Sequence, residues 1–364
     1  MSSDTELIVQ VKNEVARAWD ATSAELADGL GKSVTVAFLG SASSGKDSAI
    51  RALFGLDFGD VSPIPGSTVN LRVARLDEAG QVLIVNAPGF GDIRAEVDAI
   101  ARKVLDSLDI IVYLVNCEGG ATIDEKRDLD MIRATGRPVL VCLNKIDLIR
   151  VAERGEFIAA TTAQLGMLPA DVVVCAFDPL PQLSETPIGV EYVIGWIERQ
   201  LQASGKALLF AKHLRNKAAA CEPLIQTAAR NAALIGAIPI PGADLAGVTA
   251  VQVKLIRDIA EVHGVPMNKD LAMFLIGEIL SGGMRGFVRW GIGALKAAGF
   301  IPGTQIAEAA ILGLSSMVAG ATTYGIGQAA LRYIQSGAKM DSEALRNVFD
   351  LASWDWKKLV DGKR

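Results

Sequence analysis

The pattern of hydrophobic and polar positions changes near residue 203. Before that point, short β-branched apolar runs alternate with stretches of mixed polarity that have helical spacing. These runs predict strands at 33–40, 69–76, 81–87, 109–116, 138–144 and 171–177. Four of them are almost continuously apolar, which is typical of a parallel sheet covered by helices on both faces. Residues 69–87 are instead predicted to form a hairpin that turns at 78–80.

Helical patterns flank this region on both sides. Apolar residues recur at helical spacing within 4–29 (Leu7, Val11, Val15 and Trp19), which predicts an amphipathic helix. After residue 204 the strand patterns stop, and helices broken at Gly and Pro are predicted at 205–236, 243–263, 268–282, 285–299, 303–335 and 341–360. The predicted organisation is an N-terminal amphipathic helix at 1–32, an α/β domain at 33–203 and an all-α hydrophobic helical domain at 204–364.

Composition and charge narrow the class of protein. Half of the residues are hydrophobic, which excludes a disordered or fibrous chain. The 36 basic and 41 acidic residues give a net charge of −5, so no nucleic-acid partner is expected. The N-terminal stretch mixes charges without an apolar signal core, and the four cysteines lie far apart (Cys117, Cys142, Cys175 and Cys221). These features predict a cytoplasmic protein with reduced, buried thiols.

A glycine-rich stretch between the first strand and a helix is the main candidate for chemistry. Residues 40–48 read Gly-Ser-Ala-Ser-Ser-Gly-Lys-Asp-Ser, and a helical pattern follows directly. This is the context of a phosphate-binding P-loop, in which backbone N–H groups and the helix N-terminus face the phosphates and Lys46 reaches the β and γ oxygens. The residues predicted to bind nucleotide here are Gly40, Ser43, Ser44, Gly45, Lys46, Asp47 and Ser48.

A second motif ends another apolar strand later in the chain. Asn144-Lys145-Ile146-Asp147 matches the N-K-x-D pattern of GTPases. The Asp147 carboxylate can accept hydrogen bonds from the N1–H and the 2-amino group of guanine, whereas adenine lacks that amino group and presents an acceptor at N1. The stem of Lys145 is expected to pack on the base, and Asn144 to brace the loops. Cys175, Ala176 and Phe177 stand where GTPases place S-A-K, whose backbone contacts the guanine oxygen.

Two segments between these motifs are candidates for sensing the γ-phosphate. Pro65-Gly66-Ser67-Thr68 resembles the P-G-T-T of switch I in Era-like GTPases, which puts Thr68 in the magnesium-binding place. Residues 86–92 close a predicted strand and match the D-T-P-G of switch II, apart from its first two residues.

Residues 33–203 therefore resemble a translation-factor-class GTPase of the Era-like and dynamin-like group. The stretch at 43–46 is similar to the S-A-G-K of dynamin-type loops, and the motif at 238–244 resembles a bacterial C-terminal domain of unknown function found behind such GTPases. The order of the segments also resembles, more loosely, the immunity-related GTPases. The resemblance implies GTP or GDP and Mg²⁺ as cofactors, slow hydrolysis accelerated in a G-domain dimer or homo-oligomer, and Lys46, Thr68 and Gly89 as catalytic residues.

Two departures from the family pattern fall on the predicted metal site, which comprises Asp47, Thr68 and Asn86. Asp47 stands where the family has Ser or Thr, and Asn86 stands where it has Asp. In one interpretation the two residues have exchanged roles and Mg²⁺ still binds. In the other the site has decayed, and nucleotide is held weakly or hydrolysed poorly. Phe90 is a third departure, because Ras-like GTPases have near that position a glutamine that orients the attacking water.

The helical half leaves the relation to membranes open. Residues 309–331 form a run of 23 without a charge, which is long enough to span a bilayer but only moderately apolar. They predict either a buried helix of a bundle or a segment that inserts into or docks on a membrane. Lys206, Lys212, Arg215 and Lys217 predict either a solvated helix face or a surface for anionic headgroups.

Three functions are consistent with these features. The first is a slow GTPase switch or dynamin-like mechanochemical enzyme, whose helical domain engages membrane lipids or another subunit. The second is a nucleotide-binding module without hydrolysis, in which Asp47 and Asn86 have disabled the metal site. The third is an integral protein at the cytoplasmic face of a membrane, with a GTPase head.

Overall fold

The structure, a computed structural model, describes residues 3–57, 72–87, 107–238, 243–282 and 305–360. Its contacts divide the chain into two compact units. Gly29–Ala220 form what we call the sheet unit, and Met1–Asp28 with Cys221–Arg364 form the helical unit. Several predicted features lie outside the described residues, namely Thr68, Gly89, Phe90 and the helix at 285–299.

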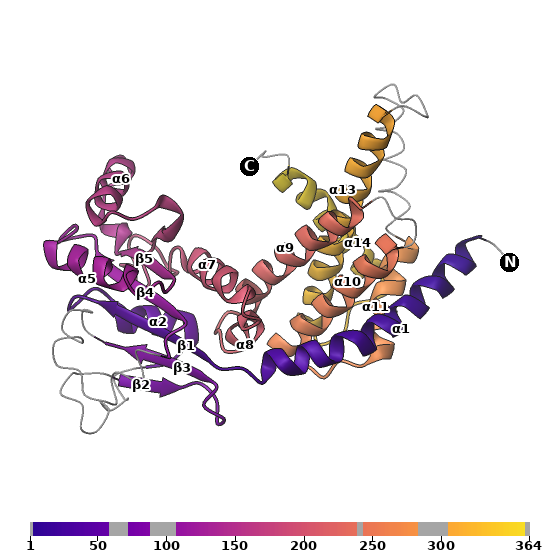
Figure 1. The fold of residues 1–364 in the computed structure, drawn as a ribbon, viewed down its shortest axis with the longest axis horizontal. Coiled ribbons are helices and arrows are strands. Elements are labelled where there is room, and N and C mark those ends of the chain that lie inside the picture. Colours follow the sequence, from indigo (N-terminus) through magenta and orange to yellow (C-terminus); the bar gives the residue numbers. More distant parts are fainter. Residues whose placement is uncertain (1–2, 58–71, 88–106, 239–242, 283–304, 361–364) are drawn as a thin grey trace. The chain divides into compact units, whose positions relative to one another are not determined.

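Six strands form the sheet (Figure 1). They are β1 (Val34–Gly40), β2 (Arg72–Arg75), β3 (Val82–Asn86), β4 (Ile110–Asn116), β5 (Val139–Asn144) and β6 (Val172–Val174), in the spatial order β2-β3-β1-β4-β5-β6. β2 and β3 pair antiparallel through the predicted hairpin, and every other neighbouring pair of described strands is parallel. The predicted strands and their mostly parallel arrangement are confirmed.

Parallel pairing brings the carboxyl ends of several strands to one edge of the sheet. Gly40 at the end of β1 pairs with Leu114 of β4, and Asn116 pairs with Asn144 at the ends of β4 and β5. Asn86 ends β3, the other neighbour of β1. Ligand sites of open α/β sheets lie at such an edge, so these residues mark where a site is expected.

One face of the sheet is covered by α5 (Ile123–Arg133) and α6 (Arg154–Leu165). Leu129 and Leu165 of these helices share a hydrophobic core with strand residues such as Val141. Two short 3-10 helices, η2 (Ile146–Leu148) and η3 (Pro169–Asp171), follow β5 and α6.

The other face is covered by α2 (Lys46–Phe54), α7 (Val190–Gln202) and α8 (Ala207–Ala211). Phe54 packs edge-on against Phe38 of β1 and Phe210 of α8, with ring centroids 6.2 and 5.9 Å apart. The α/β prediction with helices on both faces is thus confirmed. All four cysteines are buried and free, as expected.

The prediction of one helix over 205–236 was wrong in its middle. The chain turns at 212–216, between α8 and α9 (Lys217–Gly236). The Asn216 side chain accepts a hydrogen bond from Ala219 N (3.0 Å) in the manner of an N-cap, and Arg215 N donates to Leu53 O (2.7 Å) at the end of α2. The first bond caps α9, and the second ties the segment after α8 to the end of α2.

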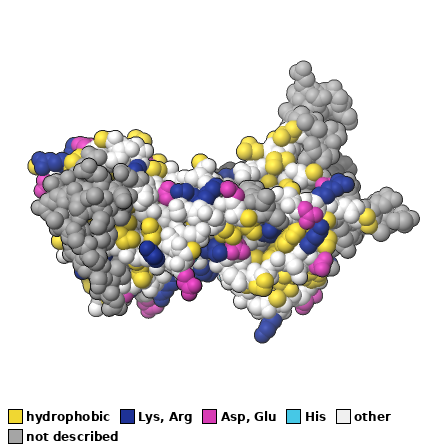
Figure 2. Space-filling view, turned by 60° about the horizontal axis from the view of Figure 1, so that its bottom comes forward, with side chains coloured by type: hydrophobic (Ala, Val, Ile, Leu, Met, Phe, Trp, Pro, Cys, Tyr) yellow, Lys and Arg dark blue, Asp and Glu magenta, His cyan; other side chains and the backbone are white. Residues whose placement is uncertain are grey.

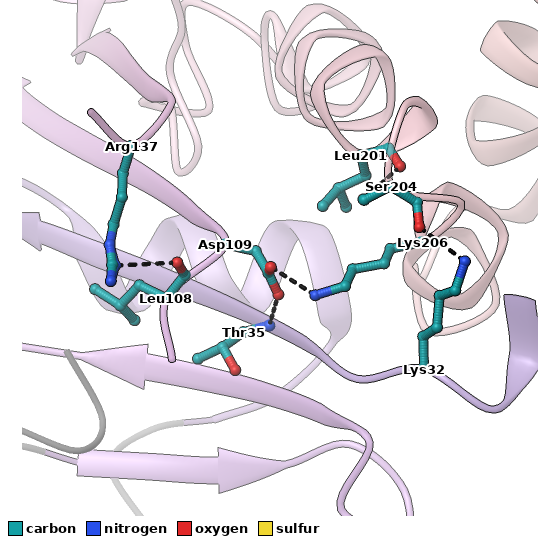
Figure 3. A network of polar contacts seen from close by, with 8 residues as sticks. All are labelled: Lys32, Thr35, Leu108, Asp109, Arg137, Leu201, Ser204 and Lys206. Atoms are coloured by element: carbon teal, nitrogen blue, oxygen red, sulfur yellow. Dashed lines mark hydrogen bonds and ion pairs between the residues drawn. The ribbon is translucent and has the colours of Figure 1, made fainter. Parts of the chain in front are cut away.

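A polar network closes the amino-end edge of the sheet, opposite the strand ends described above (Figure 3). Asp109, just before β4, accepts hydrogen bonds from Thr35 N (3.0 Å) and Lys206 Nζ (2.6 Å). Lys32, just before β1, donates to Ser204 O (3.0 Å). The network joins the segment just before β1 and the residue just before β4 to the segment that follows α7. Lys206, one of the four residues of the predicted basic cluster, is therefore engaged within the sheet unit.

The helical unit contains α1 (Ser3–Leu30), most of α9, α10 (Ala243–Val262), α11 (Lys269–Gly282), α13 (Gln305–Gln335) and α14 (Ser342–Val360) in its described part. The helix predicted at 4–29 is confirmed as α1. Arg257 of α10 holds it in place. The Arg257 guanidinium lies 4.3 Å from the centroid of the Trp19 ring and donates to Trp19 O (2.8 Å) and Thr22 Oγ1 (3.0 Å).

α13 is packed tightly by its neighbours. Its residues 319–331 are buried apart from the half-buried Gln328. A Cβ on Gly325 would lie 2.7 Å from the Phe349 ring of α14, and a Cβ on Gly327 would lie 2.9 Å from side chains of α9 and α10. Glycine therefore allows three helices to approach α13 closely. Residues 319–331 of the uncharged run therefore belong to the core of the helical unit, whereas Gly313 is exposed and residues 315–318 are half-buried. Of the helices described, none is long and apolar enough to cross a membrane, α13 included.

Candidate nucleotide-binding site

The loop between β1 and α2 has the backbone of a phosphate-binding turn. Gly40, Ser43 and Gly45 have φ angles of 139°, 62° and 94°. A Cβ on Gly45 would lie 2.1 Å from Asn144 Nδ2, and a Cβ on Gly40 would lie 2.3 Å from a backbone oxygen of β4, so both positions require glycine. The loop leads into Lys46, the first residue of α2, whose N-terminal N–H groups are available to an anion.

Lys46 folds over this loop. Its Nζ donates to Gly40 O (2.8 Å) and to Ser41 O (2.9 Å). Burial lowers the pKa of the Lys46 ammonium, and the neighbouring Asp47 carboxylate acts in the opposite direction. Because the ammonium is held by loop carbonyls, it is in place for phosphate oxygens bound within the same loop.

Asn144, the last residue of β5, joins three loops. Its Nδ2 donates to Ser44 O (2.8 Å) in the P-loop, and its Oδ1 accepts a hydrogen bond from Phe177 N (3.2 Å) after β6. Ile146 N also donates to Cys175 O (3.1 Å). The structure therefore brings the P-loop, the N-K-x-D segment and the buried stretch at 175–177 together at one edge of the sheet.

One carboxylate oxygen of Asp147 is a buried acceptor without a partner in the described part of the chain. The residue is 8% exposed, and its Oδ2 accepts a hydrogen bond from Leu180 N (3.1 Å). Its Oδ1 has no hydrogen-bond partner among the described residues. Burial, and secondly the charge of Asp147, raise the pKa of the adjacent Cys117 thiol to about 12. A buried carboxylate oxygen is costly to leave unpaired, so Asp147 fits a ligand that brings N–H donors, as guanine does.

Asp47 and Asn86, which depart from the family pattern at the predicted metal site, are in contact. Asn86 Nδ2 donates a short hydrogen bond to Asp47 Oδ1, which links the end of β3 to the first turn of α2. Asn86 is 7% exposed. The pair offers a carboxylate and an amide oxygen, both of which are ligand types that Mg²⁺ accepts. Within the described residues no group of three or more His, Cys, Asp or Glu is placed to hold a metal, so the pair would depend on phosphate oxygens and water for the remaining ligands.

Comparison with known proteins accounts for both halves of the chain. The family described as "50S ribosome-binding GTPase" matches residues 35–145, and the family described as "Domain of unknown function (DUF697)" matches residues 202–352. Residues 35–145 therefore form a P-loop GTPase-family domain, and residues 202–352 form a DUF697 domain.

Several known proteins are similar to about a third of this chain. GTPase Era of Borreliella burgdorferi (strain ZS7) is 30% identical over 122 residues, which are 32% of this chain and 42% of that protein. Magnetosome membrane protein 22 of Magnetospirillum gryphiswaldense is 29% identical over 117 residues, which are 31% of this chain and 57% of that protein. Among solved structures, a probable GTP-binding protein engB is 18% identical and covers 47% of this chain and 100% of its own, with a TM-score of 0.35. The chain spans less than half the length of its Era relative.

Proteins of this GTPase family bind GTP and GDP, typically with Mg²⁺. In this chain the predicted P-loop residues lie in one loop and in the start of the helix that follows it, and Ser44 Oγ is buried there without a partner among the described residues. Ser43 is exposed, and Ser48 is half-buried on α2. Thr68 and Gly89, the other predicted catalytic residues, lie outside the described residues.

Two carboxylates of the candidate nucleotide-binding site were not predicted from the sequence. Glu125, 4% exposed, accepts a hydrogen bond from Ser41 Oγ (3.2 Å) of the P-loop and forms a capping box with Thr122. The T-x-x-E spacing at 122–125 could have indicated it. Glu118 pairs with Lys145 (2.9 Å), and its position just past β4, the neighbour of β5, was the available signal.

Proposed function

We propose that this chain binds GTP and GDP at the loops formed by residues 40–48, 144–147 and 175–177, and that it hydrolyses GTP slowly. The observation that carries the proposal is the buried Oδ1 of Asp147, which has no partner among the described residues and lies beside a P-loop held by Asn144. Guanine supplies two N–H donors to such a carboxylate, whereas adenine presents an acceptor there and would leave the oxygen unpaired.

The phosphate chemistry would fall to Lys46 and the N-terminus of α2. In hydrolysis a water oxygen bonds to the γ-phosphorus, the bond to the β–γ bridging oxygen breaks, and GDP and inorganic phosphate are released. Lys46 and the helix N–H groups neutralise charge on the β and γ oxygens as it shifts. Thr68 and Gly89 are proposed to sense the γ-phosphate. Turnover is proposed to be slow because Phe90 has no polar group to orient the water.

Asp47 and Asn86 would hold Mg²⁺ together with Thr68. The family pattern has Ser or Thr at position 47 and Asp at position 86, whereas this chain has Asp47 and Asn86. Both combinations provide one carboxylate and one neutral oxygen, so the formal charge of the pair is the same. When bound, the ion neutralises phosphate charge. The contact between Asn86 and Asp47 supports a shared site for these two side chains.

The DUF697 domain is proposed to receive nucleotide-dependent changes and to engage membrane lipids at the cytoplasmic face, or a second copy in a dimer or larger oligomer. On α14, Leu351 is 70% exposed and Trp354 is 40% exposed, which supports such contacts. The net charge of −5 favours these partners over nucleic acid. On the face shown in Figure 2, basic and acidic side chains are interspersed rather than gathered into a field of one sign.

A second candidate is a nucleotide-binding module that does not hydrolyse GTP. The hydrogen bond between Asn86 and Asp47 favours it, because two side chains that satisfy each other have less need of an ion. In this case binding would survive while turnover is absent with or without Mg²⁺.

GTP turnover by the purified chain, with Mg²⁺ and with the metal chelated, tests the proposal. The slow-GTPase function predicts turnover that requires Mg²⁺. Asp47→Ser and Asn86→Asp should each lower turnover more than the double variant does, because exchanged roles are restored when both change. Guanine-nucleotide binding without turnover would select the second candidate, and absence of binding would reject both.

A further inference from the structure

The far end of the Lys145 side chain is held by Glu118. Lys145 Nζ lies 2.9 Å from Glu118 Oε2, across the loops that follow β5 and β4. Lys145 has a left-handed backbone (φ 66°), which sets the direction in which its side chain leaves the loop. Because an unrestrained lysine side chain samples many rotamers, a partner at its end limits where the aliphatic stem lies.

Glu118 is itself held in position. Its N–H donates to Asn116 Oδ1 (3.1 Å), and Asn116 Nδ2 donates to Glu118 Oε2 (3.3 Å). The next link is backbone: Cys117 N donates to Asn144 O (3.0 Å) at the start of the N-K-x-D segment. Hydrogen bonding to Lys145, and secondly to Asn116, lowers the pKa of the Glu118 carboxyl. The carboxylate is therefore charged at neutral pH and fixed beside the base-binding residues.

The location of this ion pair matters more than its strength. The side chains of Lys145 and Glu118 are 31% and 53% exposed, and exposed pairs contribute little to folding stability. For comparison, the nearby ion pair of Arg150 and Glu153, with 3.5 Å between nitrogen and oxygen, joins two residues only three positions apart in the sequence. The pair of Lys145 and Glu118 instead joins two strand-end loops and restrains the lysine of the N-K-x-D motif. Its effect is expected on a bound base rather than on the fold.

We propose that Glu118 is a positioning residue for guanine. By holding the Lys145 ammonium, it keeps the lysine stem over the face of the base and slows the release of nucleotide. Glu118 acts through Lys145 and needs no contact with the nucleotide. This inference rests on the proposed guanine-nucleotide function of the same loops.

The test is the release of a fluorescent GDP from the full chain in Mg²⁺, timed after addition of excess unlabelled GDP. Glu118→Gln should speed release by about two- to fivefold at low salt, the range that an exposed ion pair supports. The difference from wild type should shrink at high salt, because screening weakens the pair in the wild type alone. Glu153→Gln removes another exposed carboxylate close to the motif and should release GDP at the wild-type rate.

A double-mutant cycle with Lys145→Ala separates positioning from a general effect on the loop. Glu118→Gln should not speed release further once Lys145 is replaced. Additive effects, or equal rates for wild type and Glu118→Gln, overturn the proposal. If release from Lys145→Ala is too fast to time, the salt series decides, and equal salt dependence in wild type and Glu118→Gln overturns it. Failure of the wild type to bind GDP at all would overturn the guanine-binding function as well, which distinguishes the two failures.

Discussion

Replacing Glu198 of α7 by methionine should stabilise the sheet unit at neutral pH. Glu198 is 1% exposed, and neither of its carboxylate oxygens has a hydrogen-bond partner among the described residues. An unsatisfied buried polar group costs about 1–3 kcal/mol, and methionine has a similar length without the carboxylate. We expect Glu198→Met to raise the free energy of unfolding by about that amount at pH 8. A gain of about 2 kcal/mol corresponds to roughly 4–8 °C in Tm for a unit of this size.

The pH dependence of this gain tests its cause. Burial raises the pKa of the Glu198 carboxyl well above its ordinary value, so the folded protein keeps it protonated where the unfolded chain ionises. This contribution to wild-type stability is fully present below the ordinary glutamate pKa and is lost as the pH rises through the raised value. Glu198→Met lacks this term, so its advantage over wild type should grow from about pH 4 to about pH 8.

Thermal unfolding of the full chain across this pH range measures the effect, with hydrogen exchange of α7 peptides assigning the transition to the sheet unit. Glu191→Met, the same substitution at an exposed position of the same helix, is the matched control and should change stability by no more than about 1 kcal/mol. A Glu198→Met variant that is less stable than wild type at pH 8, or that keeps the wild-type pH slope, would refute the reasoning. Glu198 would then be ionised and paired in the folded protein.

Four further outcomes follow from the packing of single residues. Gly325→Ala should destabilise the helical unit by about 1–3 kcal/mol, because its Cβ would lie 2.3 Å from a side-chain oxygen of α14. Gly313→Ala, on the same helix but with no described atom within 4 Å, should stabilise it by up to about 1 kcal/mol, and thermal unfolding of both variants checks the opposite signs. Gly45→Ala should abolish tight GDP binding in an equilibrium titration, because its Cβ would displace Asn144, and wild-type affinity would contradict this account of the loop. The Cys117 thiol, whose pKa burial raises to about 12, should resist maleimide at neutral pH in the folded protein and react on unfolding.

The sheet and the P-loop could be predicted from the sequence because each depends on local chemistry. Continuous apolar runs indicate buried parallel strands, and Gly40 and Gly45 stand where the backbone takes positive φ. The contacts between distant residues could not be predicted in this way. Asp109 and Lys206 are 97 positions apart, and Asn86 and Asp47 are 39 apart, so their pairing depends on strand order.

The sequence also could not place the turn between α8 and α9 or decide the environment of the uncharged run. No Gly or Pro marks a break at 212–216, but the Asn216 cap and the bond from Arg215 to the end of α2 end one helix and start the next there. For 309–331, hydropathy measures how apolar a helix is and does not distinguish lipid from protein as its surroundings. The structure shows that protein surrounds this part of α13, because Phe349 of α14 packs in the space that Gly325 leaves.

This dependence of α13 on α14 has a consequence for shortened forms of the protein. Phe349 and Ser353 of α14 lie against Gly325, and Trp356 stacks on Tyr324 with ring centroids 5.4 Å apart. A chain cut just before α14 would uncover an apolar stripe of α13 around Gly320, Tyr324 and Gly325, within a stretch of sequence that has no charged residue. Such a stripe promotes aggregation and adsorption to lipid. Proteolysis or early termination near residue 340 would therefore expose an apolar helix that is buried in the intact protein, while leaving every nucleotide-binding motif of the chain in place.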